Sequence, residues 1–171
     1  MEIDLTVESN HPVSFVRWVD VDKVYANDYN PNSVAPPEMK LLEHSIASDG
    51  FTQPIVVWET EDGYEVVDGF HRHLVGKKIG MKKLPVVIIN VNRSDRGDRI
   101  ASTIRHNRAR GKHQVGAMSD IVQELARRNW SDNKIANELG MEPDEVLRLK
   151  QITGLAEMFA DEEFSAAWEV D

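Results

Sequence analysis

Asp68, His71 and Arg72 place a carboxylate, an imidazole and a guanidinium within one five-residue segment, Asp-Gly-Phe-His-Arg. The residues before this segment, 64–67, are mostly apolar and β-branched, which is typical of a strand. The residues after it carry apolar side chains at helical spacing and end at Gly80, a frequent helix stop. The three chemically active side chains therefore stand where a strand passes into a helix.

This corner has the properties of an anion site. The first N–H groups of a helix have no partner within the helix and carry a partial positive charge, so an anion placed there meets ready donors. Gly69 permits close approach of the backbone, and Arg72 can hold phosphate oxygens with two hydrogen bonds. Asp68 is suited to hold Mg²⁺ or to accept a proton. The residues leave a second interpretation open, in which Asp68 caps the helix and Arg72 is solvated or paired.

The corner is expected at the end of a β-hairpin. Residues 55–58 predict the first strand, Asp62-Gly63 the turn, and residues 64–67 the second strand. The other predicted elements are a helix over residues 36–50 and strands over residues 13–19 and 84–90, the last of them apolar throughout, as in a strand buried on both faces. Together they predict an α+β domain with a small mixed sheet over residues 1–92.

Only helices are predicted over residues 93–171, which form a second, all-α domain. Ser94 is expected to cap its first helix and the segment 105–113 to end it. Residues 131–152 have the layout of a helix-turn-helix, but its second helix begins with the acidic run Glu-Pro-Asp-Glu. A DNA-reading helix needs basic or amide side chains at that point. A helical packing module is therefore at least as well supported as a DNA reader.

The composition limits the classes of function. The chain has 171 residues, no cysteine and a net charge of −9, which excludes disulfides and argues against nonspecific coating of nucleic acid. Residues 93–113 are the exception, with six Arg and one Lys against two Asp. Neither a signal peptide nor an apolar membrane span is recognisable, so we expect a cytoplasmic protein without a membrane partner.

Four stretches together resemble the ParB/sulfiredoxin superfamily over roughly residues 16–155. They are WVDVDKVYANDYNPN at 18–32, LLEHSIASDGFTQPIVV at 41–57, YEVVDGFHRHLVGKKIGMKKLPVVII at 64–89 and RHNRAR at 105–110. In length and in the Asp-Gly-x-His-Arg form, the chain most resembles IbrB-type prophage co-activators. The resemblance implies a ParB/sulfiredoxin-like fold followed by a helix-turn-helix-like domain, together with nucleotide binding and a role in transcription regulation.

The same resemblance implies roles for individual residues. It implies ATP or CTP bound with Mg²⁺, with Asp68 and Asn107 at the metal and Asp68 and His71 as catalytic groups. The nucleotide-binding residues that it implies are Gly50, Thr52, Gln53, Pro54, Gly69, Phe70, His71, Arg72, Asn107, Arg108 and Arg110. Phe70 stands where sulfiredoxin has its cysteine, which excludes sulfiredoxin chemistry. His106 stands where ParB proteins carry a glutamate, which weakens the expectation of ParB-like CTP switching.

The residues leave three functions open. The first is a nucleotide-binding regulator, with or without slow hydrolysis, that acts with DNA through residues 93–113 and the helical domain, with a protein partner or as a homodimer. The second is a small-molecule phosphotransferase, because Asp-Gly-x-His-Arg also resembles free-serine kinases of the same superfamily. The third is a protein-interaction module with a degenerate pocket.

Overall fold

The computed structural model describes residues 4–29, 36–89, 95–108 and 115–159, of which Arg108 and residues 153–159 are described by their backbone only. The chain divides into two compact units, Met1–Lys112 and His113–Asp171. None of the described helices is both long enough and apolar enough to cross a membrane.

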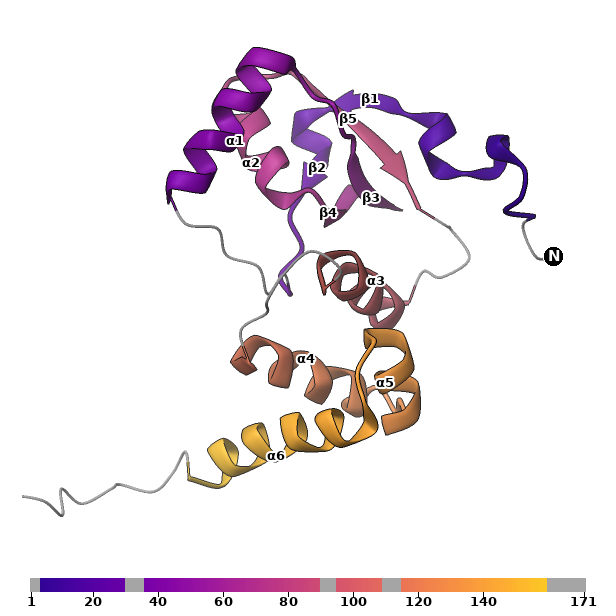
Figure 1. Cartoon of the computed structure of the whole chain (residues 1–171), viewed down its shortest axis with the longest axis vertical. Helices are drawn as coiled ribbons and strands as arrows, with labels where there is room; N and C mark the ends of the chain where they lie inside the picture. Colours follow the sequence, from indigo (N-terminus) through magenta and orange to yellow (C-terminus); the bar gives the residue numbers. More distant parts are fainter. Residues whose placement is uncertain (1–3, 30–35, 90–94, 109–114, 160–171) are drawn as a thin grey trace, which may run out of the picture. The chain divides into compact units, whose positions relative to one another are not determined.

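Within the described residues, the first unit is built on a five-stranded mixed sheet in the order β1-β5-β3-β4-β2 (Figure 1). The strands are β1 (Arg17–Asp20), β2 (Val24–Tyr25), β3 (Ile55–Thr60), β4 (Gly63–Asp68) and β5 (Lys83–Ile88), with short 3₁₀ turns at Glu8–Asn10, Pro12–Phe15 and Val21–Lys23. β3 and β4 form the predicted antiparallel hairpin. The strand predicted over residues 13–19 begins only at Arg17, because Pro12 starts a 3₁₀ turn there.

Helices cover both faces of this sheet. α1 (Pro36–Asp49) and α2 (Phe70–Lys78) contact each other on one face, above a core made of Val24, Ile55, Val57, Val66, Leu84 and Val86. α3 (Arg96–Arg108) packs on β4 from the other face, since it contacts Glu65, whose side chain alternates with that of the core residue Val66. Figure 1 shows α3 across the sheet from α1 and α2. β4 therefore lies between two helical layers.

α3 belongs to the first unit, whereas the predicted domain boundary assigned it to the helical half. Ile100 and Ile104 are fully buried, and the helix continues through Arg108 where the segment 105–113 was expected to end it. The predicted cap Ser94 lies outside the described residues, and Asp95 Oδ2 accepts a hydrogen bond from the N–H of Gly97 at 2.8 Å. The division at 112/113 comes one helix later than the predicted 92/93, because an amphipathic pattern shows that a face is buried without showing against what.

The second unit consists, among its described residues, of α4 (Val115–Arg127), α5 (Asp132–Leu139) and α6 (Pro143–Phe159), which pack on one another. Ser131 caps α5 by accepting from the N–H of Lys134, and Gly140 ends it with a left-handed φ of 65°. α5, the Gly140 turn and α6 have the predicted helix-turn-helix layout. The core side chains are Met118, Ile121, Val122, Leu125, Ile135, Leu139 and Val146.

His73 joins α2 to β2 inside the first unit. It is 2% exposed, and its Nε2–H donates to the carbonyl oxygen of Val24 at 3.0 Å. Burial, together with the nearby charge of Lys77, lowers the pKa of His73 below its ordinary value of 6.5. The neutral imidazole is therefore favoured in the folded protein, and protonation favours the unfolded chain.

We expect His73→Gln to make the protein less sensitive to acid. The glutamine amide keeps a donor for Val24 and does not titrate. The wild type should retain the contribution of neutral His73 above about pH 6.5 and lose it as the pH falls through the lowered pKa, so its free energy of unfolding should decrease more than that of the variant. Urea unfolding at a series of pH values between about 5 and 8 measures the difference. Parallel curves for the two proteins would contradict this role.

Two helical glycines test how tightly α2 packs on the sheet. A Cβ at Gly76 would lie 2.4 Å from Leu84 Cδ2, whereas a Cβ at Gly116 would meet nothing within 4 Å. Gly76→Ala should lower the free energy of unfolding by about 1–3 kcal/mol, because the buried core has to shift. Gly116→Ala is the matched control and should change it by less than about 0.5 kcal/mol. Urea denaturation followed by circular dichroism compares them, and equal stabilities would show that Leu84 yields without cost.

Candidate functional site

β4 and α2 meet at Gly69, where the candidate site begins. The φ of Gly69 is 94°, in the left-handed region that favours glycine, and no described side chain caps α2 at this position. Asp68 is the last residue of β4, and Arg72 pairs with it, as the second interpretation expected of Arg72. The first N–H groups of α2 therefore meet the condition for an anion site.

Arg72 folds back over this corner. Its Nη2 lies 3.6 Å from Asp68 Oδ2, and its Nη1 donates to the side-chain oxygen of Gln53. A Cβ on Gly69 would lie 2.9 Å from Arg72 Nη2, so the guanidinium occupies the space that a larger residue would fill. Three segments of the chain thus hold one cationic group at the start of α2.

The loop between α1 and β3 supplies the Gln53 side of the corner. Gly50, at φ 76°, and exposed Thr52 share this short loop with Gln53, and Pro54 leads from it into β3. Gln53 is the member of this predicted group that the structure brings to Arg72. The others are placed near the corner by chain connectivity.

Phe70 and His71 begin α2 and differ in what they contact. Phe70 packs against the sheet core and meets the ring of His71 edge to face, with centroids 5.3 Å apart. Burial lowers the pKa of His71, which makes its neutral form, able to accept a proton, dominant near neutral pH. His71 is therefore chemically suited to the predicted role, while Phe70 serves mainly the core.

Contacts along α3 follow β4 toward the corner. Arg99 Nε lies 3.3 Å from Glu65 Oε1. One residue further along β4, the amide of Asn27 donates to the carbonyl oxygen of Val66 at 2.6 Å and lies 3.5 Å from Thr103 Oγ1, one turn further along α3. α3 and β4 thus run in the same direction.

Asn107 lies one helical turn beyond Thr103. Extending the same register carries it toward the end of β4, where Asp68 and the corner lie. Asn107 is 7% exposed, and its Nδ2 has no hydrogen-bond partner within the described parts of the chain. A buried amide donor of this kind is costly unless a ligand satisfies it. The side chain of Arg108 and the whole of Arg110 lie outside the described residues.

A buried polar cluster behind the corner was not predicted from the sequence. Tyr29 donates its hydroxyl to Glu65 Oε1, the same carboxylate that contacts Arg99. Burial, reinforced by Glu65, raises the pKa of Tyr29 far above its usual range. Arg96 pairs with Asp28 at 3.0 Å and lies over the Tyr29 ring. The available signal was the charged residue Glu65 within an otherwise apolar strand.

The donor set fits only a metal that takes most of its ligands from elsewhere. No group of three or more acidic or imidazole side chains suited to a metal ion occurs among the described residues. Mg²⁺, however, commonly binds through one or two carboxylates together with substrate phosphates and water. The Asp68 carboxylate, 5% exposed, is compatible with that mode but does not form a metal cage.

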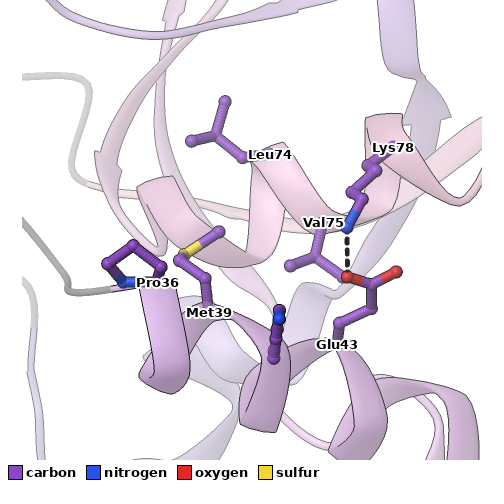
Figure 2. A pocket seen from close by; sticks show the side chains of 7 residues that line it. Pro36, Met39, Glu43, Leu74, Val75 and Lys78 are labelled. Atoms are coloured by element: carbon purple, nitrogen blue, oxygen red, sulfur yellow. Dashed lines mark hydrogen bonds and ion pairs between the residues drawn. The ribbon is translucent and has the colours of Figure 1, made fainter.

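A separate groove lies between α1 and α2 (Figure 2). It has a volume of about 520 Å³ and is lined by Pro36, Met39, Lys40, Glu43, Leu74, Val75 and Lys78. Lys78 Nζ pairs with Glu43 at 2.5 Å across it. It contains none of the predicted site residues, so it is distinct from the Gly69 corner.

Comparison with known proteins gives matches to both units. Residues 6–107 match the ParB N-terminal domain, and residues 113–161 match the IbrB-like C-terminal HTH domain. The uncharacterised protein YbdM of Escherichia coli K12 is 58% identical over 166 residues, which cover 93% of this chain and 78% of YbdM.

Two further matches are more distant. The ATP-dependent L-serine kinase of Staphylothermus marinus is 37% identical over 84 residues, which are 46% of this chain and only 32% of the kinase. The chromosome-partitioning protein ParB of Caulobacter crescentus, solved with the centromeric parS site, superposes with a TM-score of 0.56 at 18% identity over 84% of this chain and 76% of that structure. The latter likeness concerns the fold. Because the ParB N-terminal model spans more than half of the sequence, the chain belongs to the ParB N-terminal domain family.

Proposed function

We propose that this protein is a nucleotide-binding regulator in which ATP or CTP, with Mg²⁺, places its phosphates at the Gly69 corner. The observation that carries the proposal is the guanidinium of Arg72, held over the start of α2 by Asp68 and Gln53. A preformed cation beside helix N–H donors offers both charge and directed hydrogen bonds to a phosphate.

Charge supports phosphate as the ligand. The chain as a whole carries −9, which would repel a triphosphate, whereas residues 93–113 carry six Arg and one Lys against two Asp. α3 carries part of this basic segment on the sheet face opposite α1 and α2, and its register on β4 would bring Asn107 toward the end of that strand. Arg72 from α2 and the basic side chains that follow Asn107 would then neutralise the phosphates from two sides.

The residues at the corner would have different roles. Asp68 would share Mg²⁺ with the phosphates, and Asn107 would donate its unused N–H to a phosphate oxygen or orient a metal-bound ligand. His71, kept neutral by its lowered pKa, would accept a proton if hydrolysis occurs. The metal would supply charge neutralisation.

The second unit would convey the nucleotide state to a partner. Its helix-turn-helix layout and the parS complex of the structurally similar ParB favour DNA. The acidic residues Glu142, Asp144 and Glu145 at the start of α6 disfavour base reading by that helix. We therefore assign DNA contact to the basic segment 93–113, with α6 available to a protein partner or a second copy.

A small-molecule phosphotransferase is the second candidate, favoured by the match to an L-serine kinase over about half of this chain. The same corner would serve it, since phosphoryl transfer depends chiefly on positioning and charge neutralisation. Asp68 would then orient the acceptor hydroxyl or the metal.

Isothermal titration with each of the four nucleoside triphosphates and Mg²⁺ tests the common basis of both candidates. We expect binding of ATP or CTP, and Arg72→Lys should weaken it by about tenfold or more, because lysine keeps the charge but loses the two-point grip. Arg128→Lys is the matched control, since Arg128 also pairs with a carboxylate at i−4, at 3.0 Å from Glu124. No heat with any triphosphate would refute both candidates.

Turnover separates the two candidates. A kinase should consume ATP only when an acceptor such as serine is added, and Asp68→Asn should abolish that turnover while nucleotide still binds. A regulator should show the same slow rate with or without acceptor. Measuring the release of phosphate and of nucleoside diphosphate, with and without serine, decides between the kinase and the regulator.

DNA contact predicts a dependence on salt and on the basic segment. A labelled duplex should bind in fluorescence anisotropy at low salt, and replacing both Arg108 and Arg110 with alanine should weaken binding and reduce the salt slope by about two. Arg17→Ala, on the exposed strand β1, is the control. Equal affinity of the double variant and the wild type would remove this segment from the interface.

A further inference from the structure

Glu65 is a buried carboxylate for which the chemistry of the Gly69 corner has no direct use. It is 8% exposed, accepts from the hydroxyl of Tyr29, and lies 3.3 Å from Arg99 Nε. Removing an ion pair from water is costly, so a cluster of this kind adds little net stability compared with apolar packing. The cluster instead fixes orientation, because its directional contacts allow only one relative placement of the Tyr29, Glu65 and Arg99 side chains.

The three members come from three different parts of the first unit. Tyr29 lies in the segment that follows β2, Glu65 lies on β4, and Arg99 lies in the first turns of α3. Among the described residues of α3, the fully buried apolar side chains are Ile100, Ala101 and Ile104, so its apolar face is narrow. A narrow apolar face holds a helix down but resists sliding and rotation weakly, whereas a directional ionic contact resists both.

The cluster and the corner are linked by matched spacing. Glu65 precedes Asp68 by three strand residues, about 10 Å, and Arg99 precedes Asn107 by eight helical residues, about 12 Å. The amide of Asn27, which touches both Val66 and Thr103, is a second contact at an intermediate point of the same register. Fixing α3 at Glu65 therefore determines where Asn107 arrives relative to the end of β4.

We infer that Tyr29, Glu65 and Arg99 form a positioning cluster that sets the register of α3 on β4 and so holds Asn107 against the Gly69 corner. This inference rests on the proposed nucleotide site and adds residues that do not touch the ligand. Their effect on binding passes through Asn107, and it leaves the Arg72 side of the corner unchanged.

A double-mutant cycle distinguishes positioning from general stability. Asn107→Ala in the wild type should weaken Mg²⁺–nucleotide binding by about tenfold. In a Glu65→Gln or Tyr29→Phe background, which should itself bind less tightly, the same change should cost less than about threefold, because Asn107 is no longer in place. The cost of Arg72→Lys should stay the same in all backgrounds. Tyr29→Phe serves as the milder variant, since it removes one donor and keeps the ion pair.

Hydrogen–deuterium exchange of the free protein provides a readout independent of ligand. Both variants should speed exchange in α3 more than in α2, whereas Glu43→Gln, which breaks the pair between α1 and α2, should leave α3 unchanged. Additive costs in the cycle, or unchanged exchange in α3, would overturn the positioning role while leaving nucleotide binding intact. A wild type that binds no nucleotide would instead overturn the proposed function, and the positioning role with it.

Discussion

The missing side chain at Gly69 allows the guanidinium of Arg72 to lie against the backbone at the start of α2, within the space that a Cβ would occupy. The left-handed φ of Gly69 turns the chain sharply from β4 into α2, so that Asp68 at the strand end and Arg72 one helical turn later face each other. Gln53 completes the arrangement from a separate loop. A cation is thereby positioned beside helix N–H groups without a ligand, which reduces the cost of ordering it when an anion binds.

β4 connects this corner to the rest of the first unit because its two faces have different partners. Val66 faces the apolar core under α1 and α2, and Glu65 faces α3, where Tyr29 and Arg99 satisfy its charge. The face of β4 toward α3 therefore contains an ionic cluster, whereas the opposite face packs in the apolar core. Its end leads directly into α2 at Gly69, and the register of α3 on β4 carries Asn107 toward the same end.

The second unit has a different character. Its fold follows from local signals that agree with each other, including the Ser131 cap, the Gly140 stop and a continuous apolar stripe. The start of α6 is acidic, whereas every Arg and Lys of the basic segment 93–113 belongs to the first unit. The proposed DNA contact therefore involves the basic segment rather than α6, and the structure of the helices alone does not require DNA at α6.

The sequence by itself determined the local elements: the hairpin, the helix from Pro36, the corner at Gly69 and the helix-turn-helix layout. Turn residues, caps and periodicity act over a few residues, so they can be recognised without a partner. Tertiary structure alone decided that α3 packs on β4, that Arg72 reaches Gln53, and that Tyr29 and Arg99 enclose Glu65. The named side-chain contacts join residues 19 to 36 positions apart, and the pattern of an isolated strand or helix shows that a face is buried without showing what covers it. The residues of the predicted site were therefore recognisable from the sequence. The cluster of Tyr29, Glu65 and Arg99, which we infer to position Asn107, was not.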